Sequence, residues 1–146
     1  MRRSPGAVVL EEFPRPLQVD GYSCGAQCTH SVLRWHGTDW SRKKVQRRLG
    51  TTTEGTDQDQ IQALLEERGL RPKYVEDGTL KTLRSAIDKG WPCIVSVDGD
   101  HWACVFGYQR GTIFVGDPAV GRGPSVLLTT KKFKKRWDGG VMVVRD

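Results

Sequence analysis

Long apolar runs are missing from this sequence of 146 residues. No segment approaches the ~18 consecutive apolar residues that a membrane-spanning helix requires. Near the N-terminus, the apolar run at 7–10 is shorter than the roughly 7–15 residues of a signal-peptide core, and Glu11 and Glu12 follow it directly. We therefore expect a cytoplasmic protein without a membrane segment.

Cysteine and histidine are scarce, with four and three residues respectively. Because the cytoplasm keeps thiols reduced, four cysteines there do not imply two disulfides. The cysteines also lack a closely spaced Cys-x2-Cys pair, which argues against a zinc site. We expect neither a metal nor an organic cofactor, and we interpret Cys28, Cys93 and Cys104 as small buried hydrophobic residues.

Internal repeats, low-complexity tracts and linkers are missing as well. The composition is that of a soluble globular protein, because 37% hydrophobic residues in a varied sequence exclude general disorder. A chain of this length fits one domain around a single core. We predict one domain over residues 1–146, in which residues 1–14 form an N-terminal extension.

Acidic residues are outnumbered by basic ones, which gives a formal net charge of +6. A basic cluster is most often a solvated helix face, although it can also attract nucleic acid or an acidic partner. No helix-turn-helix, zinc-finger or RNA-binding signature is present, so the sequence does not favour nucleic acid and leaves an acidic partner open. The two clusters consist of Arg42, Lys43, Lys44, Arg47 and Arg48, and of Lys131, Lys132, Lys134, Lys135 and Arg136.

Four segments in the N-terminal half have the pattern of amphipathic helices. Apolar residues recur at helical spacing, and capping residues and glycines bound the segments. We interpret the apolar stripes as core. The predicted helices cover 24–36, a segment capped by Ser41 and ended by Gly50, a segment capped by Thr56 and ended by Gly69, and 79–89.

The C-terminal half predicts short strands, because its segments are rich in β-branched and aromatic residues and turn residues separate them. Helices followed by an antiparallel sheet indicate the α+β class. In this pattern Gly139 and Gly140 are interpreted as a turn and not as a self-cleavage site. The predicted strands are 93–97, 102–108, 112–115, 125–128 and 141–144.

The stretch QVDGYSCGAQCTH, at 18–30, raises the question of what Cys24 does. Gly21 permits a turn and Ser23 is a candidate N-cap, so a helix is expected to begin at or beside Cys24. A helix N-terminus lowers the pKa of a thiol and makes it a better nucleophile. Gly25, a poor helix residue, makes sense if another group must approach the backbone closely there. A purely structural cysteine is the alternative.

A cysteine nucleophile needs a histidine as its base, and only one of the three histidines is suitably placed. His30 and His36 lie on the same predicted helix as Cys24 and too far along it, so they are interpreted as surface or boundary residues. His101 opens the segment HWACVFGY, at 101–108, directly after a predicted tight turn at 97–100. From there it can face a helix N-terminus that packs against the sheet.

The histidine needs an orienting group, and the reaction needs oxyanion donors. If the strands on either side of 109–111 form a hairpin, Asp117 lies within one to three residues of the position opposite His101. Gln18 lies six residues before Cys24, and a glycine-containing turn can fold its amide back beside the Cys24 N–H. The sequence therefore offers candidates for all four roles of a cysteine-dependent acyl-transfer site.

Three short motifs stand together in this chain: QVDGYSCGA at 18–26, HW at 101–102 and GDP at 116–118. They resemble the papain-like bacteriocin-processing peptidases, which cleave leader peptides after a double glycine. The resemblance covers most of the chain and implies a papain-like fold with its active site between a helical half and an antiparallel sheet. It also implies roles for the candidate residues, namely Cys24 as nucleophile, His101 as general base, Asp117 as its orienter and Gln18 as oxyanion-hole donor.

Domains of that family are usually fused to transmembrane and ATPase segments of an exporter. This sequence contains neither, so we expect a stand-alone peptidase acting on a peptide or protein substrate. An acyltransferase, a deamidase or a protease for ubiquitin-like tails would use the same thioester chemistry. A non-catalytic peptide- or nucleic-acid-binding module is a further alternative, which the basic clusters favour and the complete set of four candidate residues disfavours.

Overall fold

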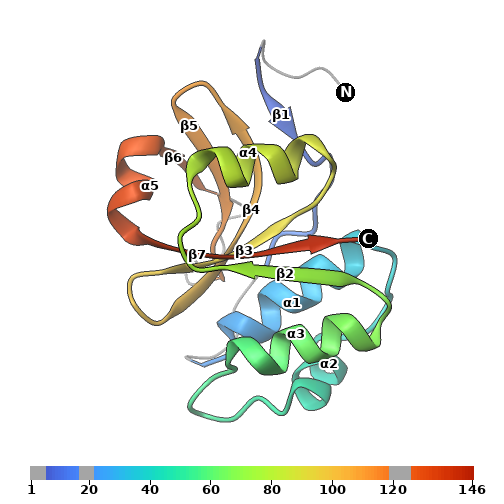
Figure 1. Cartoon of the computed structure of the whole chain (residues 1–146). Coiled ribbons are helices and arrows are strands. Elements are labelled where there is room, and N and C mark those ends of the chain that lie inside the picture. The colour runs from blue at the N-terminus through green and yellow to red at the C-terminus, as the bar shows by residue number, and fades with distance from the viewer. Residues whose placement is uncertain (1–5, 17–21, 119–125) are drawn as a thin grey trace.

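A computed structural model describes residues 6–16, 22–118 and 126–146 of the chain (Figure 1). Gln18, the predicted oxyanion-hole donor, and Gly21, the predicted turn residue, lie outside the described residues. The described part has helices on both faces of an antiparallel sheet, so the predicted α+β class is confirmed.

The N-terminal half contains α1 (Cys24–Trp35), α2 (Arg42–Leu49) and α3 (Gln58–Glu67), close to the predicted positions. The Ser41 hydroxyl accepts a hydrogen bond from the Lys44 N–H at the start of α2, and Gly50 ends this helix in the left-handed conformation. The helix α4 (Leu80–Asp88) begins after Thr79, which forms a capping box with Thr82.

The predicted cap of α3 is wrong by one residue. Asp57 caps this helix, because its carboxylate accepts from the Gln60 N–H at 2.9 Å while the Gln60 side chain accepts from the Asp57 N–H at 2.8 Å. This reciprocal pair satisfies two backbone donors, which a lone threonine cannot do. Thr56 instead hydrogen-bonds the Thr51 hydroxyl at 2.7 Å.

The described strands form one antiparallel sheet in the order β2-β7-β3-β4-β5-β6, and β1 also pairs with β4. The register of β4 and β5 matters most for the site, because Gly116 pairs with Cys104 and places the end of β5 near the start of β4. The bounds are β1 Val8–Val9, β2 Arg71–Val75, β3 Cys93–Val97, β4 His101–Gln109, β5 Thr112–Gly116, β6 Val126–Thr129 and β7 Trp137–Arg145.

Sequence patterning missed three described elements: β1, β2 and α5 (Thr130–Arg136). The segment of α5 is rich in lysine and contains Phe133 as its one apolar residue, so it shows no helical stripe. The segment of β2 contains Pro72, which is normally excluded from central strands. Here β2 is an edge strand, where a proline is tolerated.

The expected turn at Gly139 and Gly140 is wrong, because both residues lie inside β7. The pairing of β7 with β3 shifts register between Val95 and Val97, which is where this glycine pair lies. Gly139 has a φ of 98°, a left-handed conformation that glycine adopts without steric cost. The two glycines therefore bend a continuous strand.

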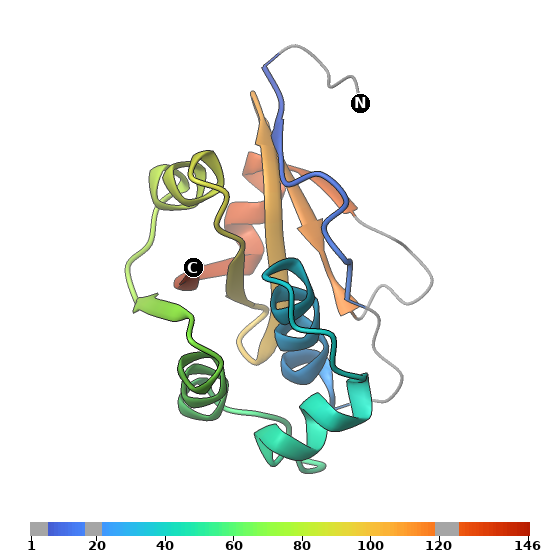
Figure 2. The same ribbon diagram turned by 90° about the vertical axis from the view of Figure 1, so that its right-hand side faces the viewer.

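The sheet carries a hydrophobic cluster on each face. Ile94 and Cys104 belong to the cluster that packs against α1, α2 and α3, whereas Val95 and Ala103 belong to the cluster that includes Phe133 of α5. Neighbouring strand residues thus point to opposite faces, as the pleat requires. Figures 1 and 2 show α1, α2 and α3 together on one side of the strands, with α4 and α5 on the other.

Buried free cysteines contribute to both clusters. Cys28, Cys93 and Cys104 are fully buried thiols, as predicted for small hydrophobic residues. Among the residues that the structure describes, no three His, Cys, Asp or Glu side chains are grouped so as to hold a metal ion. Within the same ranges, none of the helices is both long and apolar enough to cross a membrane.

The described N-terminal segment, residues 6–16, packs against the core. Val8 and Val9 pair with Tyr108 and Gly107 of β4. Phe13 is 4% exposed, and its ring stacks on that of Phe106 with the centroids 5.4 Å apart. The residues that precede α1 therefore contribute directly to the hydrophobic cluster on the α1 side of the sheet.

We expect Phe13→Ala to lower the free energy of unfolding by about 3–5 kcal/mol, because it removes a buried ring and leaves a cavity. Arg15→Ala, at an exposed position two residues on, should change it by no more than about 0.5 kcal/mol. Urea-induced unfolding followed by circular dichroism measures both. Equal stability of the two variants would show that the segment is only loosely attached.

Candidate active site

Cys24 is the first residue of α1 and is half-buried. Ser23 is the N-cap, and its carbonyl accepts the first helical hydrogen bond from the Gln27 N–H at 2.9 Å. The thiol therefore lies at the positive end of the helix dipole, as predicted. This position favours the thiolate over the thiol.

Gly25 allows this end of α1 to pack closely against its neighbours. A Cβ at this position would come within 3.0 Å of Trp102 Cδ1 and 3.2 Å of Thr56 Cβ. The Trp102 indole is itself fixed, because its Nε1 donates a hydrogen bond to the Thr56 carbonyl at 3.0 Å. The close approach predicted for Gly25 is thus confirmed, and the approaching group is the indole next to His101.

His101 and Asp117 are in direct contact. His101 begins β4, and its Nε2 lies 2.6 Å from Asp117 Oδ1. Asp117 follows the end of β5 and is 3% exposed. The pairing of Gly116 with Cys104 brings the two side chains together, so the cross-strand position predicted for Asp117 is confirmed.

Burial and hydrogen bonding act in opposite directions on Cys24. Burial raises the pKa of the thiol, but hydrogen bonds from the His101 side chain and from the backbone of Trp102 and Gly25 outweigh burial and lower it below its ordinary value. With Nε2 directed at Asp117, the other ring nitrogen of His101 is the one available to Cys24.

The pKa of the His101 imidazole shifts in the opposite direction. Hydrogen bonds to Asp117 and Cys24 raise the pKa of His101 to about 10, against the opposing effect of burial. Both shifts favour the ionised forms, a thiolate at Cys24 and an imidazolium at His101, over the neutral pair. This ionised pair combines a strong nucleophile with a proton donor.

Arg136 is a member of this cluster that the sequence did not reveal. One of its terminal nitrogens, Nη2, donates to Asp117 Oδ2 at 3.0 Å and to Asp98 Oδ2 at 2.6 Å. Its interpretation as part of a solvated basic helix face is therefore wrong. No sequence signal connects three residues this far apart, because the contact depends on how α5 packs beside the β3–β4 turn.

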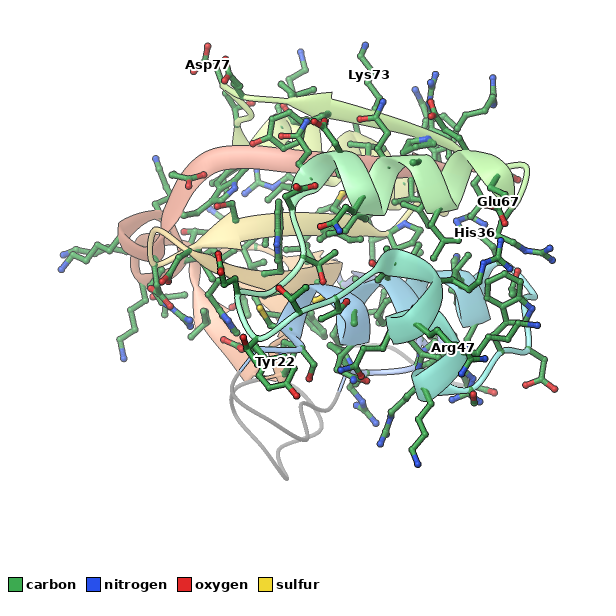
Figure 3. All side chains as sticks on the ribbon, turned by 90° about the horizontal axis from the view of Figure 1, so that it is seen from below. Tyr22, His36, Arg47, Glu67, Lys73 and Asp77 are labelled. Atoms are coloured by element: carbon green, nitrogen blue, oxygen red, sulfur yellow. The ribbon has the colours of Figure 1, made fainter. Side chains whose placement is uncertain are left out.

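The other two histidines lie outside the site, as predicted. His30 Nε2 lies 2.9 Å from the Trp40 carbonyl oxygen, and His36 Nε2 lies 3.1 Å from the Val144 carbonyl oxygen. Figure 3 shows Tyr22, two residues before Cys24, at one end of the helical layer and His36 at the other. His36 is therefore too distant to serve as the base for Cys24.

Two buried polar side chains lie close to Cys24 in the chain, one on the N-cap of α1 and one in its first turn. The Ser23 hydroxyl and the Gln27 side-chain amide have no hydrogen-bond partner in the part of the chain that the structure describes. Neither residue was predicted as part of the site. The oxyanion-hole role of Gln18 stays a prediction, and the Cys24 N–H at the start of α1 stays its predicted companion.

Comparison with known proteins gives a consistent picture. The sequence profile of the Peptidase C39 family matches residues 12–146. The chain is 24% identical over 133 residues to the lactococcin-G-processing and transport ATP-binding protein LagD of Lactococcus lactis subsp. lactis. That match covers 84% of this chain and 17% of LagD, so the chain spans less than a fifth of that relative.

Two solved structures share the fold. A double glycine motif protease from an AMS/PCAT transporter, in complex with the leader peptide, superposes with a TM-score of 0.80 at 19% identity, covering 97% of this chain and 95% of that one. The peptidase domain of Streptococcus ComA gives 0.78 at 22% identity, covering 92% and 98%. The chain belongs to the Peptidase C39 family and has the fold of a papain-like cysteine peptidase domain.

Proposed function

We propose that this protein hydrolyses peptide bonds through a catalytic triad of Cys24, His101 and Asp117. The position of His101 carries the proposal, since its ring contacts the Asp117 carboxylate at 2.6 Å and lies close enough to Cys24 to lower the pKa of the thiol. A cysteine at a helix N-terminus and a histidine oriented by a buried carboxylate meet the requirements for an activated thiol nucleophile.

In the proposed reaction, the Cys24 thiolate attacks the carbonyl carbon of the scissile peptide and forms a carbon–sulfur bond. The carbonyl oxygen becomes an oxyanion, which the Cys24 N–H and the Gln18 amide stabilise. His101 then gives its proton to the amide nitrogen, the carbon–nitrogen bond breaks, and the amine product leaves.

The resulting thioester is hydrolysed in the second half of the reaction. Neutral His101 takes a proton from water, and the hydroxide attacks the thioester carbon. The carbon–sulfur bond breaks, which releases the acid and regenerates the Cys24 thiolate beside protonated His101. Asp117 stays ionised throughout and stabilises the imidazolium. The cycle needs a free thiol, which favours a reducing compartment such as the cytoplasm.

We propose a peptide with a Gly-Gly pair before the cleavage site as substrate. One structure with this fold is a double glycine motif protease in complex with its leader peptide, and LagD is named for processing lactococcin G. Those names describe the relatives. For this chain, they indicate the first peptides to test, namely synthetic leaders that end in Gly-Gly and continue into a short cargo.

Replacing the nucleophile should abolish cleavage. We expect Cys24→Ala to reduce hydrolysis of a Gly-Gly leader peptide by about a thousandfold or more, because no other group at the site can form the thioester. Cys93→Ala, which removes a fully buried thiol in β3, should retain cleavage. Liquid chromatography with mass detection measures both variants.

The product masses also identify the reaction. Hydrolysis gives two products whose masses add up to the substrate plus one water. An adduct with an added amine would show acyl transfer instead. Full activity of Cys24→Ala would contradict the triad.

The pKa shifts predict a displaced pH dependence. The rate of Cys24 alkylation by iodoacetamide should rise with pH through a midpoint below 9.0, the ordinary pKa of a cysteine thiol. Peptide cleavage should follow the same acid limb and then fall as His101 loses its proton, with a pKa of about 10. In His101→Ala the imidazole no longer opposes burial, so the alkylation midpoint should lie at a higher pH than in the unmodified protein. Coincident alkylation profiles in the two proteins would contradict the ion pair.

Asp117→Asn tests the orienting carboxylate. Asparagine can still accept a hydrogen bond from His101, but it lacks the charge that stabilises the imidazolium. The alkaline limb of cleavage should therefore move down from about 10 toward 6.5, the ordinary value for histidine. Asp100→Asn makes the same chemical change at an exposed position beside His101 and should leave the limb in place. An unchanged limb in Asp117→Asn would exclude Asp117 as the orienter.

A further inference from the structure

We infer that Arg136 is a positioning residue of this site, which fixes the Asp117 carboxylate so that Oδ1 faces His101. The inference rests on the proposed triad and adds a residue to it. The two oxygens of Asp117 have different partners, because Oδ1 contacts His101 Nε2 at 2.6 Å and Oδ2 accepts from Arg136 Nη2 at 3.0 Å. A carboxylate held at both oxygens cannot rotate about its side-chain bond without losing one contact.

Arg136 is itself held by Asp98. The Arg136 Nε lies 3.0 Å from Asp98 Oδ1, and Nη2 lies 2.6 Å from Asp98 Oδ2, which is the two-point geometry of a strong guanidinium–carboxylate pair. The Asp98 N–H also donates to the Arg136 carbonyl at 2.8 Å. Both the side chain and the backbone of Asp98 therefore hold Arg136 in place.

This arrangement joins the ends of three elements at the site. Asp98 follows β3 and precedes His101 by three residues, with a φ of 55° that places it in the left-handed region. Asp117 follows β5, and Arg136 ends α5. Trp137, the next residue, pairs with Val97. A shift of any one of these segments would change the distance between Asp117 and His101.

The charges along this path alternate in sign. They run from the Asp98 carboxylate through the Arg136 guanidinium and the Asp117 carboxylate to the His101 imidazolium and the Cys24 thiolate. Asp117 is 3% exposed, so the Arg136 cation at its second oxygen offsets part of the cost of burying the charge. Cys28, the fully buried thiol one turn after Cys24, stays neutral because burial raises its pKa well above the ordinary value.

Arg136 differs from its basic neighbours on α5. Lys134 and Lys135 are exposed, whereas Arg136 is intermediate and makes the contacts described above. Lys135→Gln is therefore the matched control for Arg136→Gln, because both remove one positive charge from the same end of the same helix. Arg136→Lys keeps the charge but loses the fork that spans the two carboxylates.

The experiment measures the pH dependence of Cys24 alkylation and of Gly-Gly peptide cleavage in these three variants and in Asp98→Asn. In Arg136→Gln we expect the midpoint of the acid limb to move to higher pH in both profiles, and the midpoint of the alkaline limb of cleavage to move to lower pH. The reason is that a mobile Asp117 stabilises the imidazolium less. A shift of about one pKa unit would slow alkylation at the foot of the acid limb about tenfold.

Two further results would support the inference. Arg136→Lys should show a smaller shift of the limbs than Arg136→Gln, and Lys135→Gln should give the profiles of the unmodified protein. Asp98→Asn should move the two limbs toward each other by a smaller amount than Arg136→Gln does. Because the Asp98 side chain is exposed, this variant should disturb the fold less. Thermal unfolding by circular dichroism confirms that each variant remains folded. Global loosening would slow cleavage without moving the two limbs toward each other.

Two results would overturn the inference. Identical profiles for Arg136→Gln and Lys135→Gln would show that Arg136 is one more surface charge. An alkaline limb that rises in Arg136→Gln would show that Asp117 keeps its contact and that Arg136 only repels the imidazolium. In both cases the triad proposal would stand. If the unmodified protein already alkylates like an ordinary thiol, the triad fails and the role of Arg136 fails with it.

Discussion

The hydrogen bond between His101 and Asp117 is the contact on which the rest of the site depends. It joins the start of β4 to the end of β5, and the pairing of Gly116 with Cys104 brings the two residues together. The bond leaves the other ring nitrogen of His101 for Cys24, and the Asp117 carboxylate contributes to raising the pKa of the imidazole to about 10. A slip of one residue in this hairpin would turn every side chain of the strand to the opposite face and destroy the site.

The helix α1 is held in position by residues that take no part in the proposed reaction. Gly25 lets the start of α1 approach Trp102, and the indole is fixed by the Thr56 carbonyl. One turn later, the Cys104 thiol lies 3.8 Å from the Cys28 carbonyl oxygen and joins α1 to β4. Cys24 and His101 thus come from two layers of the fold, and the core between these layers holds them in place.

Much of this arrangement is readable from the sequence, for physical reasons that differ by element. Apolar stripes and capping residues predict the helices, and Ser41 and Gly50 mark the two ends of α2. The meeting of His101 with Asp117 follows from local hairpin pairing. Arg136 was not predictable, because its contacts depend on the packing of α5, whose lysine-rich sequence gives no helical stripe. The role of Gln18 stays a prediction, since this residue lies outside the described part of the chain.

The central claim is that Cys24 and His101 form an ion pair at neutral pH, and nuclear magnetic resonance of the His101 ring tests it most directly. If the pair is ionised, the His101 imidazolium persists through neutral pH and titrates with a pKa of about 10. This pKa should fall when the Cys24 thiol is capped by a neutral methylthio group, because the thiolate charge is then lost. A ring that titrates near the ordinary 6.5, with or without the cap, would contradict the claim.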